Sequence, residues 1–223
     1  MILPRGLVFL TTCWIFAAWL ICIGVRPPIQ PSIASYLPGV RIFIAIMAMG
    51  LCVGWPMLRL SERPTRAPIR QVLIDFVTIS VLLHVVLWPL RLATNWSNSR
   101  MGLIDLFLFA WGYMIAAILA LTIGSRSALE RVATMILIIM ISLLGPMAYF
   151  VSMRMHWPEP PRWMDGPLLG VLRETLGGGL HPEETTWRAT FGVCIAAVAA
   201  WFVVLIVGWM GAQAQKKHSP NPI

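Results

Sequence analysis

Long apolar stretches, separated by short polar or proline-containing segments, dominate the hydrophobic pattern of the chain. A helix needs about 20 mainly apolar residues to cross the hydrocarbon core of a bilayer. Six stretches of the 223-residue chain meet this requirement, at residues 6–25, 39–58, 71–90, 102–124, 132–153 and 189–211. Because lipid offers backbone groups no hydrogen-bond partner, each stretch is expected to be helical. The pattern predicts an all-α integral membrane bundle that forms a single transmembrane domain over residues 1–223.

One long connection, residues 154–188, joins the fifth and sixth apolar stretches. Its first part is rich in proline and charge and is expected to be extended. A helix start follows at Asp165-Gly166-Pro167, since proline suits the first helical turn. Leucines then recur on one side as far as Leu176, before three consecutive glycines. These features predict a short interfacial helix that lies on the outer membrane surface or caps the bundle.

Composition and charge agree with a lipid-facing surface. Only 12% of the residues are charged and 58% are hydrophobic, whereas a soluble domain carries about 25% charged residues. The formal net charge of +8 could indicate nucleic-acid binding, but the basic residues are scattered among the ends of the apolar stretches. One cluster, Arg59, Arg63, Arg66 and Arg70, lies at a helix boundary, where arginines meet anionic headgroups. The lipid bilayer is therefore the expected partner, and nucleic acid is not.

The distribution of basic residues bears on orientation. With a cytoplasmic N-terminus, nine basic residues lie inside and eight outside, so their number alone barely decides. The arginine cluster and the Lys216-Lys217 pair favour cytoplasmic placement of both termini. The first stretch is too long for an ordinary signal-peptide core and is interpreted as an uncleaved span. We expect a multi-pass protein of a bacterial-type inner or plasma membrane.

Two features bear on how the spans pack. The fourth span carries small residues at a spacing of four, which places them on one helix face: Gly112, Ala116, Ala120 and Gly124. Such a face lets another helix approach closely, either within the monomer, which we favour, or from another subunit. In the fifth span, Gly145-Pro146 predicts a kink, because proline removes a backbone donor and clashes with the preceding turn.

Ionisable residues inside a span are costly and are functional candidates for that reason. Ser80, His84 and Arg91 share one face of the third span. Asp105 lies near the start of the fourth span, which is joined to the third by a short loop. Arg91 and Asp105 are therefore expected to pair near the outer membrane level, with His84 about two turns deeper. Such a stripe suits a proton relay or ion coordination, but a structural pair with a hydrogen-bonded histidine is the simpler interpretation.

The outer connection holds a second group of polar and aromatic candidates: His156, Trp157, Trp163, His181, Glu183 and Glu184. Imidazole and carboxylate groups can bind several divalent ions, but the spacing here matches no specific metal motif. The acids before the last span are equally explained by a helix start, where negative charge is favourable. No metal site is predicted, and the sequence leaves any cofactor unknown.

No nucleophile–base pair, carboxylate dyad or phosphate-binding loop emerges from the sequence, so enzymatic activity is not the leading expectation. The most consistent function is a membrane-embedded subunit or assembly partner of a larger complex, with protein partners in the membrane. Six spans with a helix between the fifth and sixth are also similar in topology to the membrane half of certain ATP-driven exporters. That resemblance implies a transporter permease subunit whose ATPase is a separate chain. A membrane enzyme acting at the outer surface through His156, His181 and nearby acids is the third alternative.

Overall fold

The structure is a computed structural model that describes residues 5–24, 32–65, 67–176 and 181–218. Within these ranges it contains helices and no strands. The elements in chain order are α1 (Arg5–Trp19), the π-helix η1 (Leu20–Gly24), α2 (Ile33–Met49), the π-helix η2 (Gly50–Gly54), α3 (Trp55–Ser61), α4 (Pro68–Leu87), α5 (Leu90–Thr94), α6 (Asn98–Thr122), α7 (Ala128–Met155), the 3-10 helix η3 (Arg162–Met164), α8 (Gly166–Leu176) and α9 (Glu184–His218).

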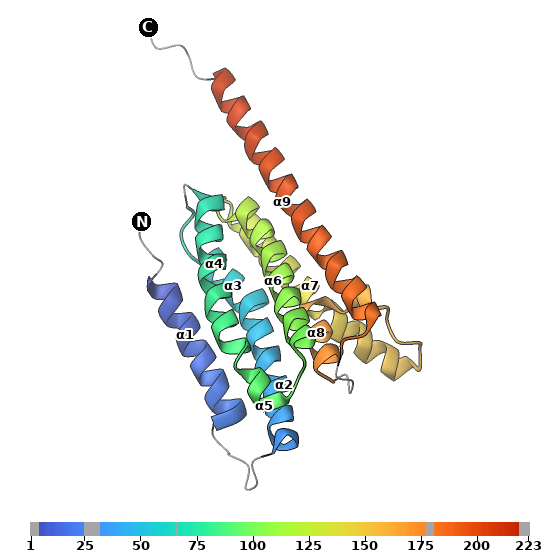
Figure 1. Ribbon diagram of the computed structural model, residues 1–223. Coiled ribbons are helices and arrows are strands. Elements are labelled where there is room, and N and C mark those ends of the chain that lie inside the picture. The colour runs from blue at the N-terminus through green and yellow to red at the C-terminus, as the bar shows by residue number, and fades with distance from the viewer. Residues whose placement is uncertain (1–4, 25–31, 66, 177–180, 219–223) are drawn as a thin grey trace.

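Six of these helices or helix combinations are long and apolar enough to cross a membrane. This confirms the predicted helical membrane bundle. The spans are α1–η1, α2–η2–α3, α4–α5, α6, α7 and α9. Figure 1 shows α1 and α9 leading to the two chain ends at the same end of the bundle, which we call the terminal face; the opposite end is the α8 face.

The second span begins earlier than the apolar pattern predicted. Helix α2 starts at Ile33, where the Ser32 hydroxyl accepts a hydrogen bond from the Ser35 backbone N–H. An N-cap of this kind satisfies one of the free donors of the first turn. Pro38 is accommodated inside the helix. The prediction placed the start after this proline, because proline usually marks a helix boundary.

Helix α6 forms the centre of the bundle. In its most apolar segment 61% of the residues are buried, against 17% for α9 and 11% for α1–η1. It packs against α4, α8 and α9. The Trp201 indole N–H of α9 donates to the Tyr113 carbonyl at 2.9 Å, and the two rings stack with centroids 5.2 Å apart. These three helices, together with α3 and α7, are therefore arranged around α6.

The small residues of α6 lie mostly inside this arrangement. A Cβ added at Gly112 would come within 3.0 Å of side-chain atoms of Phe76 in α4 and Leu51 in η2. Ala116 and Ala120 are buried, whereas Gly124 is exposed at the terminal face. At Gly112 the face of small residues therefore packs against helices of the same chain.

Helix α8 packs between other helices at one end of the bundle and does not lie separately on the membrane surface. It packs against α2, α6 and α7, and most of its residues are buried. Its first residue, Gly166, has a positive φ of 62°, a conformation that favours glycine. A Cβ at Gly145, in the C-terminal half of α7, would overlap the Asp165 carbonyl just before α8. Because Gly145 has no side chain, the start of α8 can pack closely against α7.

Candidate functional site

A histidine and an aspartate form a contact between α4 and α6, within the membrane spans. His84 Nδ1 lies 2.6 Å from Asp105 Oδ2. The Trp88 indole N–H donates to the same oxygen at 3.1 Å, and the His84 and Trp88 rings are 5.7 Å apart. The His84 side chain is 58% exposed and that of Asp105 is 21% exposed. We call this group, His84, Trp88 and Asp105, the dyad face.

The expected pairing of Arg91 with Asp105 is wrong. Helix α4 ends at Leu87, and the chain turns through Trp88-Pro89 before Arg91 enters the separate helix α5, which packs against α2. Arg91 is exposed and forms no ion pair in the described part of the chain. Ser80, one turn before His84, is partly buried and takes no part in the contact.

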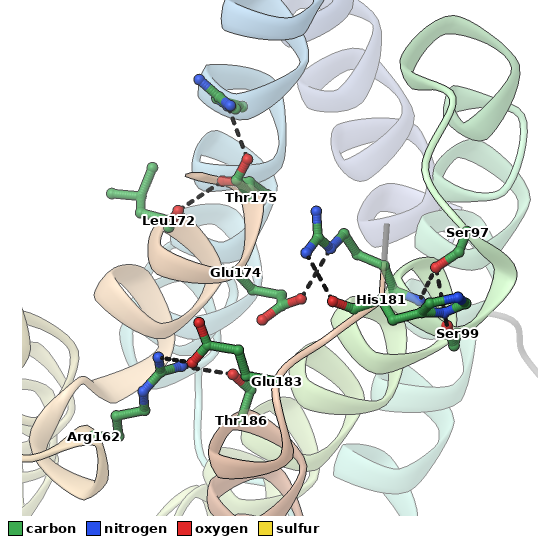
Figure 2. Close-up of polar contacts among 11 residues, drawn as sticks. Ser97, Ser99, Arg162, Leu172, Glu174, Thr175, His181, Glu183 and Thr186 are labelled. Carbon is green, nitrogen blue, oxygen red and sulfur yellow. Dashed lines mark hydrogen bonds and ion pairs between the residues drawn. The ribbon is translucent and has the colours of Figure 1, made fainter. Parts of the chain in front are cut away.

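A second polar group holds α8 in place. Arg100 of α6 donates through Nε to Glu174 Oε1 of α8 at 3.1 Å, and both side chains are less than 10% exposed. Arg100 also donates to the His181 carbonyl at 3.3 Å. Figure 2 shows Glu174 together with Arg162, which donates to Glu183 and to the Thr186 hydroxyl, each at 2.6 Å. We call this set of ion pairs, together with the Asp165–Arg173 pair, the α8 network.

The Asp165–Arg173 part of the network is less completely bonded. Arg173 Nη1 lies 3.4 Å from Asp165 Oδ1, and the guanidinium is 5.6 Å from the Tyr149 ring centroid. Asp165 Oδ1 and Arg173 Nη2 are buried and make no hydrogen bond. Burial raises the pKa of Asp165 to about 6, although Arg173 and Arg162 oppose the shift. Burial also raises the pKa of Glu174, against the attraction of Arg100.

A cavity of about 20 Å³ lies beneath α8, among side chains of α6, α8 and α9. Arg162, Asp165, Arg173 and Glu174 contribute its charged walls. A volume of this size holds about one water molecule. The cavity therefore suits a bridging water and has no room for an organic substrate.

Comparison with known proteins identifies no family. No family model matches the chain, and no curated protein or solved structure matches it. The geometry of the two polar groups therefore carries the functional argument on its own.

The candidate residues predicted in the outer connection do not come together; each has different neighbours. His156 ends α7 in a left-handed conformation and is exposed, as is Trp157. The His181 ring lies 3.4 Å from the Ser99 hydroxyl. Glu183 binds Arg162 and Glu184 binds Arg188, each at 2.6 Å; the Trp163 side chain lies outside the described part. Among the described residues, no group of three or more metal-binding side chains comes together.

A third polar group, near the terminal face, did not emerge from the sequence. Arg59 of α3 binds both carboxylate oxygens of the fully buried Asp75 in α4, and Gln71 donates to Asp75 Oδ1 at 3.0 Å. Arg59 also binds Glu62, whose backbone carbonyl accepts from Arg131 of α7. We call these residues the terminal clamp. The signal was an arginine and an aspartate flanking the short turn between two spans, which brings them to one membrane level.

Proposed function

We propose that the chain is a membrane-embedded subunit of a larger complex and that it binds a partner chain through the dyad face. The observation that carries this proposal is the exposed His84 imidazole, bound to the partly exposed carboxylate of Asp105, within two spans. Ionisable side chains in membrane helices almost always face the bundle interior or a water-filled cavity. Here the imidazole faces outward, so a second protein surface covering it would remove an unfavourable contact with lipid.

The surroundings of the dyad suit a helix as the partner. Val77, Val81 and Val85 of α4 are all exposed beside it. Their branched side chains are short and rigid, which leaves a smooth surface for close packing. A partner helix with a polar side chain at the level of His84 would add an interhelical hydrogen bond. Such bonds contribute about 0.6–2 kcal/mol in membranes.

Helix α9 offers a second surface for assembly. It has 35 residues, which corresponds to about 52 Å, whereas the hydrocarbon core is about 30 Å thick. Figure 1 shows that its C-terminal part extends beyond the other helices at the terminal face. A helix that projects in this way can contact a partner outside the membrane.

Charge pairing supports a cytoplasmic terminal face in a bacterial-type inner or plasma membrane. On the α8 face, Arg100, Arg162, Arg173 and Arg188 are each bound to acids. At the terminal face, Arg63, Arg70 and Arg126 are exposed, and no ion pair is recorded for them within the described ranges. At the α8 face, Arg91 and Arg154 are also exposed and form no ion pair within the described ranges, so with Arg5 the terminal face has four such arginines against two. The positive-inside rule assigns the side with this excess to the cytoplasm.

The test is purification of the tagged chain from its native membranes in mild detergent, followed by mass spectrometry. We expect a second membrane protein at a fixed ratio. The double variant His84→Leu/Asp105→Leu should lose this protein while keeping its own melting temperature. The control variant Glu184→Gln/Arg188→Gln, which removes an exposed pair elsewhere, should keep it. Recovery of the chain alone, or only as copies of itself, would contradict the proposal and favour a self-contained permease.

A further inference from the structure

A large apolar groove separates α1 from α3 on the outside of the bundle. It has a volume of about 700 Å³ and is lined almost entirely by apolar side chains of α1, η2, α3 and α4. Leu7 and Leu10 form one wall, and Met57 and Leu58 form the other. Because α1 buries little of its surface against the bundle, the groove is a feature of a loosely attached helix.

The groove widens from the α8 face toward the terminal face. Near the α8 face the helices touch, since a Cβ at Gly39 of α2 would overlap the Cys22 carbonyl of η1. Halfway along, a Cβ at Gly50 would lie 2.5 Å from Trp14 Nε1, so one indole ring fills the gap. At Gly54, an added Cβ would meet only the backbone oxygen of Met49, at 4.0 Å. The two walls therefore diverge step by step and leave an opening at the terminal end.

Two arginines flank this opening. Arg5 is the first residue of α1, half a turn before the lining residue Leu7. Arg63 follows α3, two residues after the lining residue Ser61. Both are exposed and have no ion pair recorded within the described part. Glu62, next to Arg63 in the sequence, is already bound by Arg59, so the two arginines give the mouth of the groove positive charge.

We propose that the groove binds an anionic phospholipid from the leaflet at the terminal face. One acyl chain lies between α1 and α3, and the phosphate lies between Arg5 and Arg63. The apolar walls recognise the chain, and the arginines recognise the charge of the headgroup. Arginine near a membrane surface favours anionic lipid by about fivefold per residue, which corresponds to about 1 kcal/mol.

Native mass spectrometry of the full chain in mild detergent tests this assignment. Phosphatidylglycerol, which is anionic, and phosphatidylcholine, which is zwitterionic, are added separately at matched concentrations. We expect one tightly bound phosphatidylglycerol per chain and weaker retention of phosphatidylcholine. Equal retention of the two lipids would overturn the proposal.

Two variants separate the contributions of the groove and its mouth. Arg5→Gln/Arg63→Gln should lower phosphatidylglycerol retention about 30-fold and leave phosphatidylcholine unchanged; the control Arg126→Gln, elsewhere on the terminal face, should change neither. Gly54→Phe should fill the groove and reduce retention of both lipids. Its control is Gly192→Phe, because a Cβ there has nothing within 4 Å and lies on the distant α9.

The arginine variants leave the core unchanged, so they test the proposal even if Gly54→Phe does not fold. Phosphatidylglycerol retention by Arg5→Gln/Arg63→Gln equal to that of Arg126→Gln would overturn it. So would equal lipid retention by folded Gly54→Phe and Gly192→Phe. A protein cross-linked to a photoreactive residue at position 54 would assign the groove to a partner helix instead.

Discussion

The terminal clamp and the α8 network both bury an arginine with a carboxylate, but they differ in how fully the charges are bonded. In the clamp, both oxygens of Asp75 accept hydrogen bonds from Arg59, and Oδ1 also accepts from Gln71. In the network, Asp165 Oδ1 accepts none, and a small cavity lies beside it. The clamp connects three spans, whereas the network connects α8 to its neighbours.

We therefore expect the terminal clamp to be a rigid contact and the Asp165–Arg173 part of the α8 network to be an adjustable one. A buried ion pair compensates its desolvation only when its remaining hydrogen-bonding positions are also filled. The Arg59–Asp75 pair of the clamp meets that condition and is expected to be a fixed contact between α3 and α4, although Arg131 Nε nearby is buried without a hydrogen bond. Asp165 does not meet it, so the fit of α8 should respond to pH and to small changes in packing.

The largest effect is expected from removing the carboxylate of the clamp. Asp75→Ala leaves Arg59 buried without its main partner, which costs about 3–5 kcal/mol. We expect a sharp loss of folded yield and a lower melting temperature in detergent. Glu62→Gln is the matched control, because Glu62 is 59% exposed and its pair contributes less than about 1 kcal/mol. Similar melting of the two variants would show that the clamp is not structural.

The next effect is a pH dependence of the α8 network. Burial holds the pKa of Asp165 at about 6, above its ordinary value of 3.8. Between these values the folded chain keeps a proton that the unfolded chain has released, so the free energy of unfolding falls as pH rises. The loss is about 2 kcal/mol from pH 4 to 6 and about 3 kcal/mol over the whole titration.

Melting curves of the wild type and of Asp165→Asn are recorded at several pH values. The difference between the two proteins measures the contribution of Asp165 to the pH dependence of stability. Other titrating groups, Glu174 included, are present in both proteins and cancel. The wild type should lose stability relative to Asp165→Asn as pH rises from 4 to 6. Parallel curves would mean that folding does not change the pKa of Asp165, which would contradict this prediction.

A smaller effect is expected from adding a side chain where α8 packs against α7. Gly145→Ala places a methyl group against the Asp165 carbonyl, and overpacking of this kind costs about 1–3 kcal/mol. We expect faster proteolysis in the connection around α8 while the spans stay intact. Gly102→Ala is the control, because a Cβ there has nothing within 4 Å. Equal protease resistance of the two variants would place α8 farther from α7 than described.

The smallest effect should come from an exposed pair. Arg188 and Glu184 lie one turn apart on α9 with side chains 78% exposed. Arg188→Ala is expected to change the free energy of unfolding by about 0.3–0.5 kcal/mol. Thermal melting measures this change, and a shift as large as that of Asp75→Ala would remove burial as the explanation for the clamp.

The sequence predicts the spans well because crossing a bilayer demands long apolar stretches, whatever their neighbours. Helix α8 was also predictable, since Gly166-Pro167 and the following leucines are a local signal. The ion pairs were harder, because they depend on which helices become neighbours. Arg100 and Glu174 are 74 residues apart, and the turn at Pro89 directs Arg91 away from Asp105. Pair assignments therefore needed the structure.

Site-specific photo-cross-linking in native membranes tests the central claim, that the dyad face binds a partner chain, most directly. A photoreactive residue replaces Val81, beside His84, or Ile136, which is exposed on α7. We expect position 81 to form an adduct of fixed mass with a second membrane protein, and His84→Leu/Asp105→Leu to abolish it. Position 136 should yield no such adduct. Lipid adducts alone at both positions would contradict the claim.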